Sequence, residues 1–163
     1  MQPMQILWKR LVKGGETCPR CGATGLEIEA AAAKLAVALR PLGIETVFDT
    51  QEIDEATFKA NPSESNRVWI AGKPIEAWLG AEVGKSRCLS VCGDWNCRTL
   101  EVGGRTYETI PEELFIKAGL MAASQMIASA SSSDGGATSC CSSTAGKDPN
   151  PPTSERPKGG CCG

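Results

Sequence analysis

The sequence contains no histidine. Its absence excludes imidazole as a metal ligand and as a general acid or base. Any site for a soft metal ion must therefore use cysteine sulfur, helped at most by a carboxylate. Proton transfer would depend on thiols, carboxylates or lysine. The chain does hold nine cysteines among its 163 residues, and these are the candidates for chemistry.

Strong charge and long apolar runs are also missing. The formal net charge is −2 without a run of Lys or Arg, which argues against nucleic acid or a polybasic membrane surface. No stretch approaches the roughly 18 apolar residues of a membrane span, and MQPMQILWKRLVKGG does not fit a secretory signal. We therefore expect a cytoplasmic protein without a membrane partner. Thiols stay reduced there, so the cysteines indicate metal or redox chemistry rather than structural disulfides.

Large apolar residues are absent after Ile127. From Ser129 onward, Ser, Gly and Pro make up 18 of the 35 residues. Such a composition buries too little surface to offset the entropy of ordering the chain. We predict a folded domain over residues 1–127 and a disordered Ser/Gly/Pro/Cys-rich tail over residues 128–163.

Residues 4–53 predict a strand, a helix and a second strand. Strand patterns cover residues 4–12 and 44–53. The helix between them is marked by apolar residues at 4-3-4-3 spacing, namely Ile28, Ala32, Leu35, Leu39 and Leu42. A capping box formed by Thr24 and Glu27 would start it. This order within about fifty residues favours a right-handed parallel βαβ unit.

The rest of the domain predicts two hairpins and two further helices. A short helix is expected over residues 54–60, followed by a hairpin of RVWI and PIEAWL around AGK. A second hairpin, RTLEV and RTYET, turns at Gly103 and Gly104 and leads into a final helix from about Pro111. We predict an α/β fold with a cysteine-containing loop or hairpin insertion before the last helix.

Cys18 and Cys21 form a C-P-x-C-G motif between the first strand and the helix. Unpaired N–H groups at a helix start favour thiolate over thiol, and this lowers a cysteine pKa by about one or more units. Cys18 would then be a nucleophile whose mixed disulfide is resolved by Cys21. The same turn is common in metal knuckles, where glycine lets both sulfurs face one ion. The place between a strand and a long helix favours the redox type of dithiol over the knuckle.

This order of elements resembles the thioredoxin and glutaredoxin fold, in which a hairpin strand lies against the dithiol. More narrowly, an uncharacterised thioredoxin-like family of bacteria and archaea, a domain of unknown function, is similar in the segments ILWKRLV, GGETCPRCG, ESNRVWIAGKPIEAWLGAEVG, VCGDWNCRT and YETIPEELFIKAGLMAAS. The resemblance covers residues 4–127 and implies the fold without an activity. Thioredoxins carry a cis-proline where Ser65 and Asn66 stand here. That proline keeps metals off the dithiol in the larger family, so its absence favours metal or metalloid capture by Cys18 and Cys21.

Cys88, Cys92 and Cys97 lie close together in the segment SRCLSVCGDWNC. Three thiolates in one locality suit a trigonal soft ion or three quarters of a tetrahedral zinc site. The fourth ligand stays open between Asp94, a cysteine of the first motif and a thiol of the tail. A single disulfide with a spare thiol is the structural alternative.

The tail holds two adjacent pairs, Cys140–Cys141 and Cys161–Cys162. Adjacent Cα atoms are about 3.8 Å apart, which is shorter than a relaxed disulfide prefers, so each pair suits chelation better than bridging. Arsenite, mercury, copper(I) and cadmium all favour such ligands. The pairs are similar to those that end the arsenical metallochaperones of resistance operons. A lineage-specific extension with little selected function is the alternative.

Two function classes follow from these thiols. We expect a thioredoxin-like dithiol protein that binds and transfers a soft metal or metalloid ion of the arsenite, mercury, copper(I) or zinc class. A metal transporter or a thiol redox protein is the expected partner. The alternative is a thiol–disulfide oxidoreductase with Cys18 as nucleophile and Cys21 as resolving thiol. The tail favours binding, because a relay needs one spaced pair rather than two adjacent ones.

Overall fold

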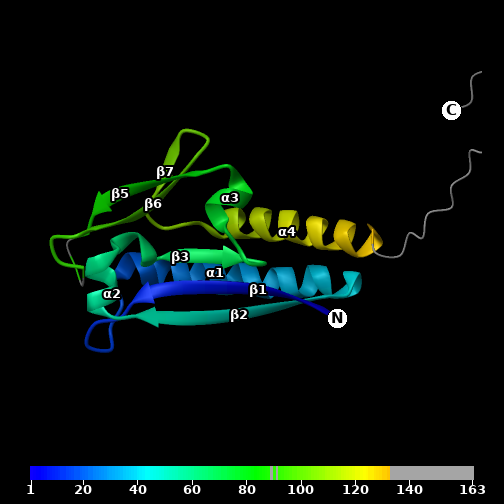
Figure 1. Ribbon diagram of the computed structural model, residues 1–163, viewed down its shortest axis with the longest axis horizontal. Coiled ribbons are helices and arrows are strands. Elements are labelled where there is room, and N and C mark those ends of the chain that lie inside the picture. Colours follow the sequence, from blue (N-terminus) through cyan, green and yellow to red (C-terminus); the bar gives the residue numbers. More distant parts are fainter. Residues whose placement is uncertain (89, 91, 133–163) are drawn as a thin grey trace, which may run out of the picture.

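The computed structural model describes residues 1–88, 90 and 92–132, and Figure 1 shows how they are arranged. They form a four-stranded sheet, a three-stranded sheet and two long helices, which confirms the predicted α/β class. Short 3-10 turns cover Arg40–Leu42 and Pro62–Glu64. In chain order the strands and α-helices are β1 (Gln2–Leu11), α1 (Pro19–Leu39), β2 (Ile44–Ile53), α2 (Glu55–Ala60), β3 (Arg67–Ile70), β4 (Lys73–Pro74), α3 (Ile75–Leu79), β5 (Glu82–Arg87), β6 (Asn96–Val102), β7 (Arg105–Tyr107) and α4 (Glu112–Ser132).

The larger sheet is built around β1, in the order β2-β1-β3-β4. β1 and β2 run parallel over their whole length, from the pair Gln2–Ile44 to the pair Leu11–Ile53. β3 lies antiparallel on the other side of β1 and pairs in turn with β4. A parallel pair needs a crossover, and α1 supplies it. The predicted βαβ unit is therefore confirmed.

α1 begins earlier than the sequence predicts. Cys18 is its N-cap residue, with an extended backbone and a sulfur that accepts the Cys21 N–H at 3.3 Å. Pro19 follows as the first helical residue, where a missing N–H costs nothing. The predicted capping box at Thr24 and Glu27 is wrong, because Thr24 is buried inside the helix and bonds to distant groups. Both cysteines of the motif therefore lie on the first turn of α1.

The segment predicted as the second strand of the first hairpin is mostly a helix. Only Lys73–Pro74 pairs with β3, and α3 follows at once. Ile75 and Trp78 are one helical turn apart, so a helix buries both side chains on one side. The Trp78 indole N–H also donates to the Ile70 carbonyl at 2.9 Å. This tertiary packing outweighs the strand pattern of PIEAWL.

The smaller sheet contains a strand that the sequence analysis missed. β5 pairs with β6 from Glu82–Glu101 to Arg87–Asn96, and β6 pairs with β7 as predicted. None of the β5 residues is buried, so the strand lacks the apolar alternation that marks strands in a sequence. The predicted cysteine-containing insertion is thus a sheet of order β5-β6-β7.

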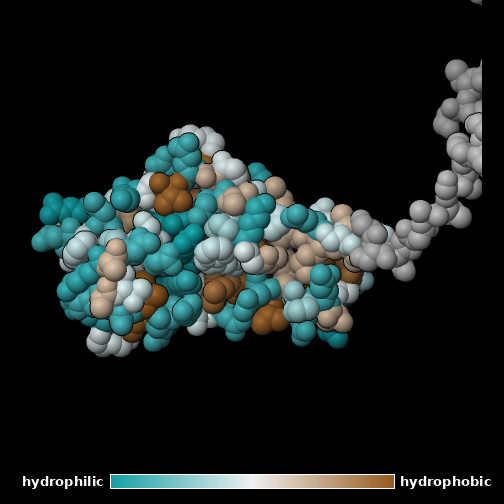
Figure 2. Space-filling view, viewed as in Figure 1, coloured by the Kyte–Doolittle hydropathy of each residue, from teal (hydrophilic) through white to brown (hydrophobic). Residues whose placement is uncertain are grey.

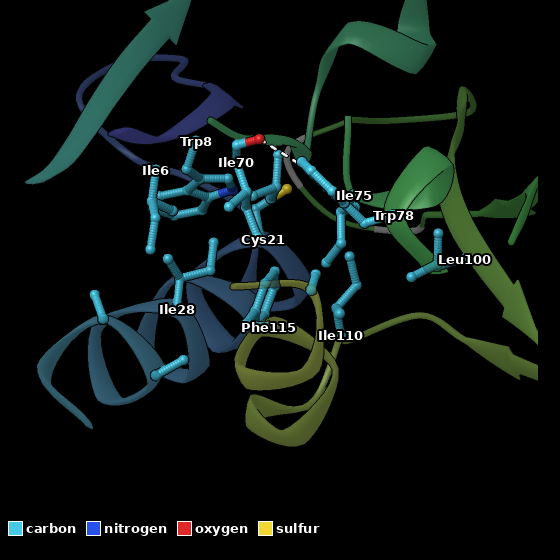
Figure 3. Close-up of a cluster of buried hydrophobic side chains, with 14 of the residues drawn as sticks. Ile6, Trp8, Cys21, Ile28, Ile70, Ile75, Trp78, Leu100, Ile110 and Phe115 are labelled. Carbon is cyan, nitrogen blue, oxygen red and sulfur yellow. Dashed lines mark hydrogen bonds between the residues drawn. The ribbon is translucent and has the colours of Figure 1, made fainter. Parts of the chain in front are cut away.

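The main core lies between the larger sheet and the two long helices, and Figure 3 shows part of it. Ile6 and Trp8 of β1 point toward the helices and are buried. Ile28 of α1 and Phe115 of α4 meet them from the other side. Because these apolar contacts hold α1 against β1, they also set where the first turn of α1 and its cysteines lie.

α4 includes a stretch, Glu112–Ser131, that could cross a membrane by length and composition alone, with a mean hydropathy of 1.2. A helix packed into a protein core meets the same criterion. α4 buries Phe115, Ala118 and Ala122 and contacts α1, α3 and β3. The face of the molecule in Figure 2 is mostly hydrophilic, with small separate apolar patches. α4 thus packs one side against the core, and 28% of the stretch is buried.

α4 continues past Ile127 to Ser132, so it includes the first residues of the predicted tail. The proposed division of the chain after residue 127 and the disorder of the tail stay predictions. Residues 133–163 lie outside the described residues, and with them the four tail cysteines, Cys140, Cys141, Cys161 and Cys162.

Candidate functional site

The turn between β1 and α1 delivers Cys18 to the helix start. Gly14 and Gly15 have φ values of 61° and 80°, which suit glycine, and they close a tight turn after β1. The Thr17 hydroxyl then donates to the Leu11 carbonyl at 2.9 Å. The turn leaves Cys18 as the helix N-cap, so its sulfur takes the place that a serine or aspartate oxygen usually fills.

The other three cysteines of the described residues come from β6 and from the loop between β5 and β6. Cys88 directly follows β5, Cys97 lies in β6, and Cys92 lies in the connecting turn. The Cys88 N–H donates to the Trp95 carbonyl at 3.3 Å, and the Trp95 N–H donates to the Cys92 carbonyl at 3.4 Å. Gly93 has a φ of 63°, which lets the chain turn back between these bonds.

The two cysteine motifs meet in one cluster. The Sγ atoms of Cys18, Cys88 and Cys92 all lie within 4.8 Å of one another. Cys97 extends the cluster, because its Sγ lies 3.1 Å from that of Cys92. Cys21 lies beside Cys18 on α1. All five are free thiols, and each is at most 4% exposed.

Arginine side chains hold the smaller sheet against the start of α1. Arg20 of α1 donates to the Ser86 hydroxyl at 2.8 Å and to the Arg98 carbonyl at 3.3 Å. Arg98 is 5% exposed and forms an ion pair with Glu76 of α3, with 2.5 Å between Nη2 and Oε1. Arg98 also donates to the Ser63 carbonyl at 3.2 Å. These contacts carry β5 and β6, and therefore their cysteines, to Cys18.

The two thiols of the first motif have very different pKa values. Hydrogen bonds from the Cys21 thiol and N–H lower the pKa of Cys18 from 9.0 to about 5, although burial opposes them. The pKa of Cys21 is raised well above its usual range, first because its thiol proton is shared with Cys18 and then because it is buried. At neutral pH, Cys18 is therefore a thiolate and Cys21 is a thiol.

The pKa values of the three thiols in the second motif also differ in direction. Burial by itself would raise the pKa of Cys88, but hydrogen bonds from Ser90 outweigh it and lower the pKa. Burial is the main reason that the pKa of Cys97 rises to about 11 and that of Cys92 rises further. The cluster thus combines two sulfurs that ionise readily with neighbouring thiols that retain their protons.

The geometry suits a soft ion held by sulfur. Zinc–sulfur bonds of about 2.3 Å place tetrahedral ligands about 3.8 Å apart, so the cluster needs only small movements to close on an ion. An all-sulfur donor set favours zinc, cadmium, copper(I), mercury or trivalent arsenic over hard ions. The suggested ligand Asp94 is wrong for this arrangement, because its side chain is 92% exposed and pairs with Arg87 at 3.2 Å.

The sequence analysis assigned no role to Ser65, which the structure brings to the dithiol. Its hydroxyl accepts the Leu11 N–H at 3.1 Å and lies 3.8 Å from the Cys21 sulfur. Asn66 beside it has a φ of 59°, and its side chain accepts the Trp8 indole N–H and donates to Thr24. Polar residues thus stand next to the dithiol where the resemblance expects a proline. Among the described residues, no peptide bond is cis.

Comparison with known proteins places the chain in a family. Residues 4–119 match the family described as "Domain of unknown function (DUF2703)". An uncharacterized protein of Archaeoglobus fulgidus is 43% identical over 111 residues, which cover 68% of this chain and 81% of that protein. No solved structure matches the chain. On the extent of the match and this identity, the chain belongs to the DUF2703 family.

Proposed function

We propose that the protein binds a soft metal or metalloid ion through cysteine thiolates and passes it to another carrier. The observation that carries the proposal is the convergence of Cys18, Cys88 and Cys92, whose buried sulfurs lie within 4.8 Å of one another. Buried thiolates of separate elements, packed together, repel one another unless a cation or a proton lies between them. A bound soft cation would remove this repulsion between the thiolates.

The proposal includes a thioredoxin-like fold. Its support is the sheet order β2-β1-β3-β4, with a parallel β1–β2 pair, an antiparallel β3 and a dithiol on the first turn of α1. The β5–β6 loop is an addition to that plan, and it covers the dithiol with further cysteines. We also propose that the protein works in a reducing compartment such as the cytoplasm, because oxidised thiols bind no ion.

Three sulfurs suit ions that accept trigonal thiolate coordination, such as trivalent arsenic or mercury. Cys97 adds a fourth sulfur beside Cys92, which would extend the set for zinc or cadmium. The tail cysteines Cys140, Cys141, Cys161 and Cys162 belong to the proposal as further ligands that exchange the ion with the cluster. A metal transporter or another thiol protein would be the partner.

Native mass spectrometry of the full-length protein, purified without oxygen and titrated with arsenite, tests the proposal. We expect the wild type to bind arsenite tightly. The affinity should fall by about 100-fold or more in Cys18→Ser, Cys88→Ser or Cys92→Ser, because losing a direct ligand lowers the affinity more than losing a residue that only orients a ligand. Cys141→Ser is the matched control and should leave the tightest site intact. A wild-type protein that binds neither arsenite, mercury nor zinc would overturn the proposal.

A thiol–disulfide oxidoreductase is the second candidate, and the contrast between Cys18 and Cys21 favours it. A low pKa gives Cys18 the thiolate for attack, and Cys21 keeps a proton until it resolves the mixed disulfide. The burial of Cys18, which is only 2% exposed, counts against attack on a protein disulfide. Insulin reduction decides between the candidates, since turnover that disappears in Cys18→Ser would support the enzyme.

A further inference from the structure

A cavity of about 260 Å³ has Cys92 in its wall. It is smaller than the roughly 300–1,000 Å³ of pockets for drug-sized ligands, so it suits a molecule about as large as an amino acid. The β1–α1 turn contributes Lys13, α2 contributes Glu55 and Lys59, and the β5–β6 loop contributes Cys92 itself. Two of these elements, the β1–α1 turn and the β5–β6 loop, also position cysteines of the cluster.

The cations of the wall outnumber the carboxylate that pairs with them. Lys13 and Lys59 both contact the same Oε1 atom of Glu55, at 3.4 and 2.8 Å. The other acid in the wall, Asp94, pairs with Arg87, which is not part of the wall. Each ammonium group has three donors, so both lysines keep donors for a further acceptor. Two lysines and two acids line the cavity, so its formal charges balance. What the wall offers an acceptor is the spare N–H donors of Lys13 and Lys59, close to a thiol.

Aromatic side chains complete the cavity on its apolar side. Phe58 is buried and Trp95 is 43% exposed, and their rings meet edge to face with centroids 6.3 Å apart. The exposed part of Trp95 offers contact area for a short carbon chain. A cation, an aromatic surface and a sulfur on one small cavity match a molecule that has a carboxylate, a few methylene groups and a thiol.

We propose that this cavity binds a small carboxylate-bearing thiol that carries the soft ion, and that Cys92 is the first residue of the protein to take the ion from it. The inference rests on the proposed function and names its exchange partner. The carboxylate would lie at Lys13 and Lys59, which directs the sulfur and its ion toward Cys92. Cys18 and Cys88 then replace the remaining carrier thiols within the cluster.

The transfer is a ligand exchange without oxidation or reduction. A bond forms between the Cys92 sulfur and the ion, and the bond between the ion and one carrier sulfur breaks. The thiol proton of Cys92 leaves with the departing carrier sulfur, so the carrier is released as a free thiol. The same steps in reverse unload the ion when the carrier thiol is in excess.

Stopped-flow absorbance with the full-length protein tests the inference. Arsenite is supplied as its complex with mercaptoacetate, which has a carboxylate, or with 2-mercaptoethanol, which has none. We expect the double variant Lys13→Gln/Lys59→Gln to slow uptake from the mercaptoacetate complex by about tenfold, since local positive charge raises association rates by that order. Uptake from the mercaptoethanol complex should not change.

A second variant changes the rate in the opposite direction. Glu55→Gln removes the carboxylate that competes for the lysines, so uptake from the mercaptoacetate complex should become faster. Lys85→Gln combined with Lys117→Gln, with both lysines outside the cavity wall, is the control for loss of two positive charges. If the double variant fails to fold, Glu55→Gln decides alone, and an unchanged or slower rate overturns the inference.

The outcomes separate this inference from the proposal on which it rests. Arsenite uptake at equal rates from both carriers, with no effect of the lysine substitutions, would overturn the cavity while leaving the cysteine site. Failure to take arsenite from either carrier would overturn the proposed function itself. Slower uptake from both carriers in the double variant would indicate a disturbed cluster and would also contradict the assigned carboxylate contact.

Discussion

The two sheets of the molecule are held together by different interactions. The larger sheet buries apolar residues of β1 and β3 against α1 and α4, as in Ile6, Val68 and Phe115. No residue of β5 is buried, and the buried part of β6 begins with Cys97, Arg98 and Thr99. In the smaller sheet, sulfur and paired charge make up most of the buried part of β6, and Leu100 is its buried hydrocarbon side chain. An apolar core is complete by itself, whereas a core of thiols gains from a ligand, and this contrast can be tested.

Loading with arsenite should stabilise the smaller sheet far more than the larger one. A ligand at 1,000 times its Kd adds about 4 kcal/mol to the state that binds it. Amides of β5 and β6 should therefore exchange hydrogen up to about 1,000-fold more slowly, and amides of β1 and β2 should change little. Hydrogen exchange with and without arsenite measures both. Uniform protection of the two sheets would contradict the contrast.

Arg98 links β6 to Glu76 of α3 and to the Ser63 carbonyl, so its removal should affect both stability and binding. Arg98→Ala leaves Glu76 largely buried without its partner, and we expect a loss of about 3 kcal/mol in urea unfolding. Arsenite affinity should also fall, because β6 loses its anchor near α3. Arg98→Met combined with Glu76→Met is the control and should recover much of the stability. Equal losses in the single and double variants would show that the unpaired charge of Glu76 is not the cause of the loss.

A close contact in the apolar core should be sensitive to one added methyl group. A Cβ at Gly25 would lie 2.5 Å from the Cη2 atom of Trp8, so Gly25→Ala should cost about 1–3 kcal/mol in unfolding. Gly22, one turn earlier in α1, has only an ordinary contact at 3.8 Å. Gly22→Ala should instead stabilise the helix by up to about 1 kcal/mol. Similar effects of the two changes would contradict this packing.

The low pKa of Cys18 predicts that the stability of the metal-free protein depends on pH. A pKa of about 5 in the folded state, against 9.0 ordinarily, stabilises the fold above pH 9 and loses that contribution as pH falls toward 5. Ultraviolet thiolate absorbance should show a step near pH 5 that is missing in Cys18→Ser. The raised pKa values of Cys92 and Cys97 act above this window. Absence of any ionisation below pH 7 would contradict the cap geometry.

The parts of the fold that sequence analysis predicted are those with regular apolar spacing. β1, β2 and the β6–β7 hairpin follow alternation or turn residues, and the structure confirms them. β5 was missed because it has no buried side, and α3 was missed because Trp78 packing decides its conformation. The start of α1 was misplaced because Cys18 caps it with sulfur, which the usual capping rules do not include.

The candidate site was predicted in its chemistry and only partly in its composition. Both motifs, at Cys18 and at Cys88, were recognised from cysteine spacing, and a shared site was one open alternative. The structure brings them together because Arg20 binds the smaller sheet to the start of α1. Ser65 was singled out only through the resemblance, as a residue standing where thioredoxins carry a proline, and its contact with Cys21 had no signal of its own. Asp94 was suggested as a ligand, but its side chain points to solvent.

What the sequence alone determined is the kind of donor. Without histidine and with nine cysteines, a site for a soft metal ion had to use sulfur, helped at most by a carboxylate, whatever the fold. Which sulfurs meet, and which of them ionise, was decided by tertiary structure. Distances between Cys18 and Cys92 depend on how one sheet packs over a helix end, and thiol pKa values depend on burial and neighbouring protons. Neither is a property of local sequence, because both arise from contacts between distant segments.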